Sequence, residues 1–289
     1  MKKSTPYLLL LPALLFTCFV LVYPLVQNLM NSLTDASLIK HGSRWVGLRN
    51  FGEIFSDDLF WLAFRNTAVY ALLGTLLALL VGLGFALLLN VKMGRMTSVA
   101  AVVYTLPWVI SPVVAGFAWK WVLNDRFGII NYWLAIAGIA GPGTPWLGDP
   151  HTALFCVILA RVWQFYPFAM VMFLAGLQAI PHEQYEAAAV DGASTLRKFF
   201  HITLPNLKSV GSVLSVLGVI WSFNDFNMVF VMTRGGPLNA SMVLPVLVRD
   251  LSFVHFDLGK GSALSIVIFA LLVSLSYLYL KVSAERDAA

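Results

Sequence analysis

Residues 67–89 read TAVYALLGTLLALLVGLGFALLL, an apolar run that contains no charged side chain. A helix that crosses a bilayer needs about 20 such residues in succession, whereas a buried helix of a soluble protein is usually shorter. The run is therefore predicted to span a membrane. Five further stretches are predicted to do the same, namely Tyr7–Met30, Thr97–Val122, Thr152–Leu177, Val210–Met232 and Ser262–Lys281.

The composition supports the same fold class. The chain has 289 residues, of which 59% are hydrophobic and only 11% charged, and its mean hydropathy is +0.81. Soluble domains carry about a quarter charged residues, so a water-soluble globule is excluded. The net charge of +5 comes from basic residues scattered between apolar runs, which argues against a nucleic-acid partner. We expect an all-α membrane protein, with six transmembrane helices in a single domain over residues 1–289.

The connecting segments indicate the orientation and the surfaces outside the bilayer. Six crossings place both termini on one side, and basic residues are denser in the loops of that side, which predicts cytoplasmic termini. The loop over residues 178–208 is then long, polar and cytoplasmic. On the opposite side, Gly128–Ile139 is apolar but too short to cross, and we place it at the outer interface. Four tryptophans near that end are interpreted as interfacial aromatics: Trp119, Trp121, Trp133 and Trp146.

The chain carries few groups that could support catalysis. No glycine-rich phosphate loop precedes a Lys-Ser or Lys-Thr pair, so the chain is not expected to hydrolyse nucleotide. His182-Glu183 opens like the zinc motif H-E-x-x-H, but Glu186 occupies the position of the second histidine. Cys18 and Cys156 both lie in apolar runs and read as small hydrophobic residues. We expect a protein that is not an enzyme, with no metal site and no cofactor of its own.

The long loop over residues 178–208 carries a local pattern of two short helices. Pro181 suits a first helical turn, and a helix is predicted from Glu183 through Asp191. Gly192 interrupts it, and Ser194 can cap a second helix that is expected to end at Pro205. The second helix places three apolar side chains on one face, those of Leu196, Phe199 and Phe200. Such a pair suits a cleft on another protein, and a loop that lies on its own bundle is an equally open alternative.

The same loop resembles a known motif. Residues 186–193 read EAAAVDGA and are followed by Ile202-x-Leu204-Pro205, which is similar to the EAA loop of binding-protein-dependent ABC importer permeases. Further segments resemble the carbohydrate-transporting branch, including Tyr23-Pro24, residues 46–51 (VGLRNF) and residues 233–237 (TRGGP). Arg234 departs from that branch without weakening the resemblance. The similarity covers nearly the whole chain and is greatest to the first, maltose-type permease subunit, without its additional leading spans and large external domain.

The resemblance implies a fold, a set of partners and roles for the loop. The fold would be the type I (MetI-like) permease bundle of ABC importers in a bacterial inner membrane. The partners would be a second permease subunit, a cytoplasmic ATPase dimer that binds ATP and magnesium, an extracytoplasmic sugar-binding protein and membrane lipid. The loop would be the coupling helix, seated in a groove of the ATPase. Its contact residues would be Glu186, Ala187, Ala188, Asp191, Gly192 and Ala193, with Glu186 charged, the alanines allowing close approach and Gly192 providing the bend.

Two charged residues inside predicted spans suggest a path for the solute. Arg161 and Asp225 lie at similar depth, where charge is costly, so they either pair near a ligand or are accommodated separately. In the second case Arg161 would extend toward the bilayer surface and Asp225 would bond neighbouring helices. Sugars need hydrogen-bond partners and aromatic faces. Candidate path residues that offer both, with Trp221 beside them, are Trp163, Gln164, Tyr166, Ser222, Asn224 and Asp225.

The expected function is that of a permease subunit of an ATP-driven ABC importer of a carbohydrate, an oligosaccharide or a related polyhydroxy solute. An ion-coupled secondary transporter is the main alternative, and a membrane-embedded enzyme is a third. A secondary transporter would usually show more spans and internal repeats, and an enzyme would need clustered reactive groups. Pro107 and Pro112 interrupt the third span, where a kink would act either as a hinge or as a packing feature.

Overall fold

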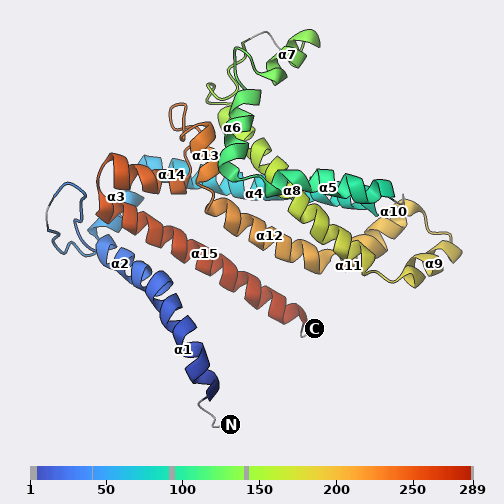
Figure 1. The fold of residues 1–289 in the computed structure, drawn as a ribbon, viewed down its shortest axis with the longest axis horizontal. Helices are drawn as coiled ribbons and strands as arrows, with labels where there is room; N and C mark the ends of the chain where they lie inside the picture. Colours follow the sequence, from blue (N-terminus) through green and yellow to red (C-terminus); the bar gives the residue numbers. More distant parts are fainter. Residues whose placement is uncertain (1–4, 41, 91–94, 140–142, 288–289) are drawn as a thin grey trace. The chain divides into compact units, whose positions relative to one another are not determined.

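The computed structural model describes residues 5–40, 42–90, 95–139 and 143–287, and in these ranges the regular structure is helical (Figure 1). Four helical runs are long and apolar enough to cross a membrane: Leu10–Ser32, Asp58–Leu89, Ala153–Gln178 and Leu258–Lys281. Two further pairs pass the same test but are bent, Val99–Val109 with Pro112–Val122 by 96° and Thr195–Asn206 with Lys208–Phe223 by 62°. The prediction of an all-α membrane protein is confirmed, with four candidate spans in the described ranges and up to six if each bent pair counts as one span.

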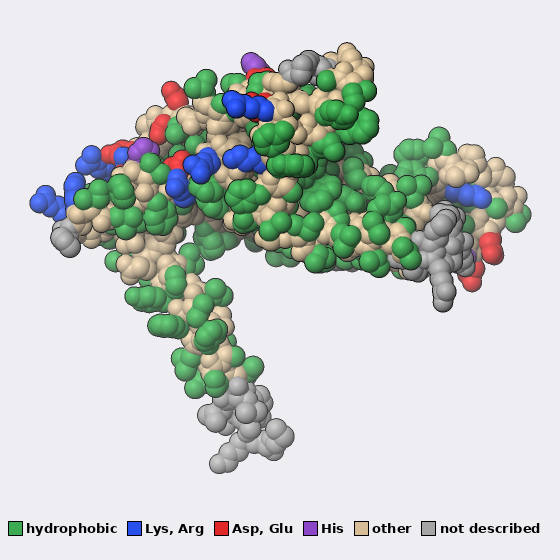
Figure 2. All heavy atoms as spheres, turned by 45° about the horizontal axis from the view of Figure 1, so that its top comes forward, with side chains coloured by type: hydrophobic (Ala, Val, Ile, Leu, Met, Phe, Trp, Pro, Cys, Tyr) green, Lys and Arg blue, Asp and Glu red, His purple; other side chains and the backbone are tan. Residues whose placement is uncertain are grey.

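The spans carry their apolar side chains outward over much of their length. Figure 2 shows hydrophobic side chains over much of the visible face, whereas the charged side chains gather in a few patches. Exposed leucine, valine and phenylalanine are frequent along the first, second and last spans. A surface of this kind is stable in lipid and not in water.

The chain divides into two compact units, residues 1–62 with 244–274 and residues 63–243 with 275–289. The prediction of a single domain over residues 1–289 stays a prediction. The first unit contains the following elements, together with the start of the last span: α1 (Thr5–Thr17), η1 (Cys18–Val22), α2 (Tyr23–Ser32), α3 (Arg49–Phe55), α14 (Leu244–Arg249) and η3 (Asp250–Val254). Two helices contribute residues to both units: α4 (Asp58–Leu89) and α15 (Leu258–Asp287).

In the first unit a buried asparagine fixes the loop that follows α2. The Asn50 amide donates to the carbonyl oxygens of Ser32 and Thr34, both at 2.8 Å. Gly259 donates its backbone N–H to the Ala36 carbonyl, and an added Cβ at Gly259 would lie 3.0 Å from the Asn50 amide. The loop is therefore held against α3 and the start of α15, and only glycine fits this approach.

The second unit contains the remaining elements: α5 (Arg95–Val109), α6 (Pro112–Val122), α7 (Ile129–Ile136), α8 (Ala153–Gln178), α9 (His182–Val190), α10 (Thr195–Lys198), η2 (Phe199–Thr203), α11 (Leu204–Asn206), α12 (Lys208–Phe223) and α13 (Asn227–Met232). Its most buried helix is α8, which contacts α5, α6, α12 and α13 (Figure 1). Gly82 of α4 allows the closest approach, because an added Cβ would lie 2.7 Å from the Ala169 Cβ and 2.9 Å from the Met170 nitrogen. The core of the unit forms around this contact and includes Met170, Phe173 and Leu214.

The third predicted span, Thr97–Val122, is not one continuous helix. It breaks between α5 and α6, where Ser111 is extended with ψ 137° and Pro112 opens the next helix. A proline has no N–H and disfavours a helical conformation in the residue before it, so the break follows from the sequence. Pro107 lies inside α5 and does not end it.

The fifth predicted span, Val210–Met232, is also wrong as a continuous helix. Helix α12 ends at Phe223 and α13 begins at Asn227. The carboxylate of Asp225 accepts a hydrogen bond from the backbone N–H of Met228 at 3.2 Å, which caps the first turn of α13. A short polar side chain that bonds the backbone in this way competes with continuation of the helix.

Candidate functional site

The loop over residues 178–208 forms two short helical segments that meet at a glycine, as predicted. Helix α9 ends in a Schellman motif, in which the Ala193 N–H donates to the Ala188 carbonyl and the Gly192 N–H to the Ala189 carbonyl. Gly192 has φ +73°, a left-handed conformation that favours glycine. The hydroxyl of Ser194 then accepts from the Arg197 N–H at 3.3 Å and caps α10.

The second segment continues past the residue at which it was expected to end. Pro205 lies in the first turn of α11, which extends to Asn206. The preceding turn, η2, is π-helical. It ends at the start of α11, where a missing proline N–H costs little. The prediction that Pro205 ends the helix is therefore wrong, and the chain bends one residue beyond α11, before α12 begins.

Side-chain contacts hold the two segments together while their outer surfaces stay open. The hydroxyls of Tyr185 and Thr203 are 2.9 Å apart, and the Asn206 amide donates to the Gln184 side-chain oxygen at 3.1 Å. Every residue of α9 is at least partly exposed. Glu186, Ala187, Asp191 and Gly192 of the predicted coupling set are exposed, and Ala188 and Ala193 are half-buried.

An apolar surface stands beside these polar contacts. Val190, Leu196 and Phe200 are 89%, 68% and 53% exposed. The spacing of Leu196 and Phe200 predicted that they share one face, whereas Val190 was not predicted to join them. A helix pair held firmly from behind, with apolar side chains facing outward, suits a groove on a partner better than a position on its own bundle.

Inside the second unit, Arg161 and Asp225 form a buried ion pair. The Arg161 Nε lies 3.9 Å from Asp225 Oδ2, and the two side chains are only 10% and 9% exposed. The Tyr70 hydroxyl donates to the same carboxylate oxygen at 2.6 Å, and Arg161 Nε donates to the Ser222 hydroxyl at 3.5 Å. The guanidinium also lies over the Phe165 ring at 4.9 Å. The two charges therefore pair, and Arg161 does not extend to the bilayer surface.

The residues of this network come from three helices and surround the break between α12 and α13. Tyr70 comes from α4, Arg161 from α8 and Ser222 from α12, while Asp225 stands between α12 and α13. A buried carboxylate requires such partners, because an unpaired charge in this interior is strongly destabilising. The arrangement fixes where the fifth span breaks.

Gln164 performs a similar role at the first break. Its side-chain Nε2 donates to the backbone carbonyl of Ile110 at 3.1 Å, in the gap between α5 and α6. In the described part of the chain, three buried polar atoms have no hydrogen-bond partner, namely Gln164 Oε1, Arg161 Nη2 and Thr75 Oγ1. Polar atoms of this kind are rare in protein interiors and are usually met by water or a ligand.

The other predicted path residues differ in exposure. Tyr166 is buried and stacks on Phe85 with ring centroids 5.2 Å apart, and Ser222 is buried and donates to the Gly218 carbonyl at 2.7 Å. Trp163 is half-buried and meets Trp119 edge-on at 5.9 Å. Asn224 is exposed, with its amide donating to the Ile220 carbonyl. The structure thus brings Gln164, Tyr166, Ser222 and Asp225 into one interior and leaves Asn224 accessible.

Three residues that were not predicted from the sequence also contribute to this region, namely Trp108, Phe168 and Tyr70. Phe168 lies 5.3 Å from both Trp108 and Trp221, measured between ring centroids, and the two tryptophans are 47% and 40% exposed. These three rings form an exposed aromatic surface on α5, α8 and α12. Tyr70 was also missed, because no local pattern connects it to a partner 155 positions away. One feature of the sequence could have indicated the aromatic surface, namely that Trp108 lies between Pro107 and Pro112.

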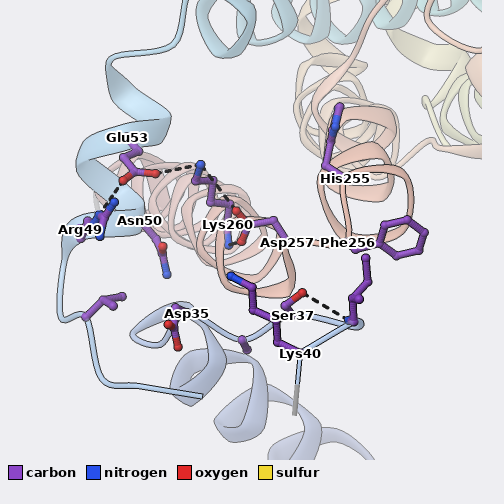
Figure 3. Close-up of a pocket in the computed structure, with 13 residues that line it drawn as sticks. Asp35, Ser37, Lys40, Arg49, Asn50, Glu53, His255, Phe256, Asp257 and Lys260 are labelled. Atoms are coloured by element: carbon purple, nitrogen blue, oxygen red, sulfur yellow. Dashed lines mark hydrogen bonds and ion pairs between the residues drawn. The ribbon is translucent and has the colours of Figure 1, made fainter. Parts of the chain in front are cut away.

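A second polar feature lies in the first unit, as a hollow of about 470 Å³ (Figure 3). Glu53 of α3 bonds Arg49 at 2.7 Å and Lys260 at 2.8 Å, and Lys260 also lies 3.5 Å from Asp257. The hydrogen bonds from Lys260 and then Arg49 lower the pKa of Glu53 below its usual value. The ion network connects α3 to the start of α15.

Comparison with known proteins identifies the family. Residues 74–287 match the family described as binding-protein-dependent transport system inner membrane component. The chain is 35% identical over 285 residues to the trehalose/maltose transport system permease protein MalF of Thermococcus litoralis, covering 97% of this chain and 94% of that protein. It is 34% identical over 281 residues to the sulfoquinovosyl glycerol transport system permease protein SmoG of Agrobacterium fabrum, covering 97% and 90%.

The fold agrees with this assignment. A permease chain from the crystal structure of a bacterial alginate ABC transporter, in complex with an alginate pentasaccharide-bound periplasmic protein, superposes with a TM-score of 0.83. The match covers 96% of this chain and 93% of that chain at 20% sequence identity, which shows a shared fold. The extent of both matches, together with the broken spans and the exposed helix pair, shows that this chain belongs to the family of binding-protein-dependent transport system inner membrane components.

Proposed function

We propose that the chain is the permease subunit of an ATP-driven ABC importer that carries a carbohydrate or a related polyhydroxy solute. The observation that carries this proposal is full-length similarity to permeases named for trehalose, maltose and sulfoquinovosyl glycerol. A full assembly would contain a second permease subunit, two copies of a cytoplasmic ATPase and an extracytoplasmic sugar-binding protein. ATP and magnesium would be bound by the ATPase, and this chain would hold no cofactor and hydrolyse nothing.

The proposed orientation places both termini and the helix pair α9–α11 in the cytoplasm of a bacterial cell. The density of basic residues, which is higher in the loops of that side, supports this orientation. The family description names an inner membrane component, which supports the location in a bacterial inner membrane.

The helix pair is proposed to be the coupling element. Glu186 would supply a charged contact to the ATPase, Ala187 and Ala188 the close approach, and Gly192 the bend, with Asp191 and Ala193 beside it. The exposed Val190, Leu196 and Phe200 would fill the apolar part of the groove. Closure of the ATPase dimer would then move α12 through the bend that precedes it, as a rigid-body change driven at an interface.

The solute path is proposed to run along the region that joins α5, α8 and α12. Trp163, Gln164, Tyr166, Ser222, Asn224 and Asp225 were predicted to line it, and the aromatic surface of Trp108, Phe168 and Trp221 adds faces on which sugar rings stack. Asn224 lies in the same region, three residues after Trp221, and offers an exposed amide. The buried members of the set support the wall behind these groups.

The sharpest test of coupling is a pair of glycine variants. Gly192→Leu forces a branched side chain into a left-handed backbone at the bend, and Gly138→Leu does the same at φ +68° after α7, on the other side of the proposed membrane. Neither site has an atom within 4 Å of an added Cβ, so both carry strain without a clash. Each strain costs about 1–2 kcal/mol.

In the reconstituted complex, Gly192→Leu should abolish both solute uptake and the stimulation of ATP hydrolysis by the loaded binding protein, while Gly138→Leu keeps both. Normal uptake and stimulation in a correctly inserted Gly192→Leu complex would refute the coupling role. The secondary-transporter alternative is not favoured by the family match. It also predicts the opposite inhibitor pattern, with uptake blocked by a protonophore and insensitive to vanadate.

A further inference from the structure

A second hollow lies in the larger unit, where α6 ends and α7 begins. Its volume is about 450 Å³, and its wall includes three aromatic rings and two charged side chains, those of Trp121, Phe127, Tyr132, Asp125 and Arg126. The break at Pro112 lies at the start of α6, and the hollow lies at the other end of this helix. The transport mechanism proposed above does not use the hollow.

The turn that carries these side chains is rigid. The buried Asn131 donates through its amide to the backbone carbonyls of Asn124, Asp125 and Thr144 at 3.0–3.2 Å, and it accepts from the Trp146 indole N–H at 2.6 Å. The side-chain oxygen of Asn124 accepts hydrogen bonds from the backbone N–H groups of Arg126 at 2.9 Å and Phe127 at 3.2 Å. An added Cβ at Gly128 would meet the Asn124 nitrogen at 2.7 Å. Exposed side chains on such a support are held ready for a ligand, with little ordering cost on binding.

The apolar surface around the hollow continues the exposed apolar face of α6. That helix exposes Val114, Phe117 and Trp121, and together with α5 it is long and apolar enough to form a bent span. Helix α7 exposes an apolar stripe at the i, i+3, i+4 and i+7 spacing, made of Ile129, Tyr132, Trp133 and Ile136. Tyrosine and tryptophan on a short helix of this kind are typical of the headgroup level of a bilayer.

The charges at the hollow are of opposite sign and are not used by the protein itself. Asp125 and Arg126 are exposed neighbours, and in the described ranges neither side chain forms an ion pair. A lone guanidinium beside aromatic rings at headgroup level suits a phosphate. The adjacent carboxylate disfavours a headgroup with only negative charge and suits one that also carries a cation.

We propose that this hollow binds the headgroup of a zwitterionic phospholipid that carries a primary ammonium group. The Arg126 guanidinium donates to the phosphate, and the Asp125 carboxylate accepts from the ammonium. The rings of Trp121, Phe127 and Tyr132 contact the glycerol and the first methylene groups, and the acyl chains follow the exposed face of α6. A free sugar would leave the stripe of α7 in water, so lipid is the favoured occupant.

The test is native mass spectrometry of the full-length chain in detergent, with equal amounts of phosphatidylethanolamine, phosphatidylcholine and phosphatidylglycerol. Phosphatidylethanolamine should be retained best. Phosphatidylcholine should be weaker because its quaternary ammonium has no N–H, and phosphatidylglycerol should be weaker because it meets Asp125. Arg126→Gln removes a charge-assisted hydrogen bond and should weaken retention of phosphatidylethanolamine about tenfold.

Two further variants separate the site from a general effect of charge. Asp125→Asn should remove the preference for phosphatidylethanolamine over phosphatidylglycerol, because the repelling carboxylate is gone. Arg44→Gln, an equal change at an exposed loop residue, should leave all three lipids unchanged. Wild-type retention in Arg126→Gln, a wild-type preference for phosphatidylglycerol, or displacement of the lipid by maltose or maltotriose would each overturn the proposal.

Discussion

The break between α5 and α6 and the break between α12 and α13 interrupt two predicted spans in chemically different ways. The first is made by a proline, and the carbonyl of Ile110 at that break is satisfied by the neutral side chain of Gln164. The second contains no proline, and the carboxylate of Asp225 caps the new helix while Arg161 balances its charge. Both partners come from α8, three residues apart, so one turn of the most buried helix stabilises both breaks.

The difference shows that the energetic cost of a helix break depends on whether the side chain that satisfies it is charged. In an interior without water, each free backbone group needs a partner. A neutral partner costs little to desolvate, whereas a carboxylate needs a cation and further donors before it is tolerated. The charged break is therefore the more sensitive to the loss of one partner.

The largest expected effect is that of Arg161→Met, which leaves the Asp225 carboxylate buried without its cation. Breaking a buried pair by removing one partner costs about 3–5 kcal/mol. We expect the free energy of unfolding of the full chain to fall by that amount. Thermal or denaturant unfolding in a fixed detergent measures it.

Two controls make the result specific to the pair. In the double variant Arg161→Met with Asp225→Asn, much of the lost stability should return, because no buried charge remains. Arg65→Met, at an exposed position of α4, should leave unfolding unchanged. Equal losses in the single and double variants would show that the ion pair is not what stabilises the second break.

The sequence predicts these two breaks unequally. Pro112 indicates the first break, because the effect of a proline on its own helix is local and does not depend on the rest of the fold. Ser222, Asn224 and Asp225 were predicted to line a polar solute path inside a continuous span, and no local pattern indicated a break there. The deciding partner, Tyr70, lies 155 positions away, and pairing over that distance follows only from packing.

The helix pair at residues 182–206 shows the same rule. Pro181, Gly192 and Ser194 act on adjacent backbone groups, so their positions predicted both the bend and the cap. The prediction at Pro205 was wrong because a π-helical turn precedes it, and the pattern of apolar residues does not reveal such a turn. The hollow at α3 was not predicted either, because Glu53 and Lys260 are far apart in the chain.

A smaller effect is expected at the first break. Gln164→Leu removes the hydrogen bond to the Ile110 carbonyl and leaves that acceptor unsatisfied, but it also removes the buried Gln164 Oε1 that has no partner in the described part of the chain. The two changes partly offset each other, so the net loss should be about 1 kcal/mol. Unfolding under the same conditions measures it, with the exposed Gln178→Leu at the end of α8 as the matched control. A loss as large as that of Arg161→Met would contradict the distinction between a neutral and a charged break.

The smallest effect is expected at the exposed ion network of the first unit, which tests whether burial or charge alone sets the cost. The Glu53 and Lys260 side chains are 36% and 34% exposed, and pairs of this kind contribute about 0–1 kcal/mol. A double-mutant cycle with Glu53→Gln and Lys260→Met should therefore give a coupling below about 1 kcal/mol at pH 7, well under the value for Arg161 and Asp225.

The pH dependence of that coupling has a definite sign. The hydrogen bonds from Lys260 and Arg49 lower the pKa of folded Glu53 below the ordinary value of 4.5. A carboxylate with a lowered pKa adds stability that is complete above its unfolded value and is lost as the pH falls through the folded value. When the unfolding of the four cycle members is measured between pH 7 and pH 3, the coupling should stay unchanged down to about pH 5 and disappear as the pH falls through the lowered pKa of folded Glu53. A coupling that grew on acidification would mean that Glu53 is protonated in the folded protein, and the contrast between the exposed network and the buried pair would then need another cause.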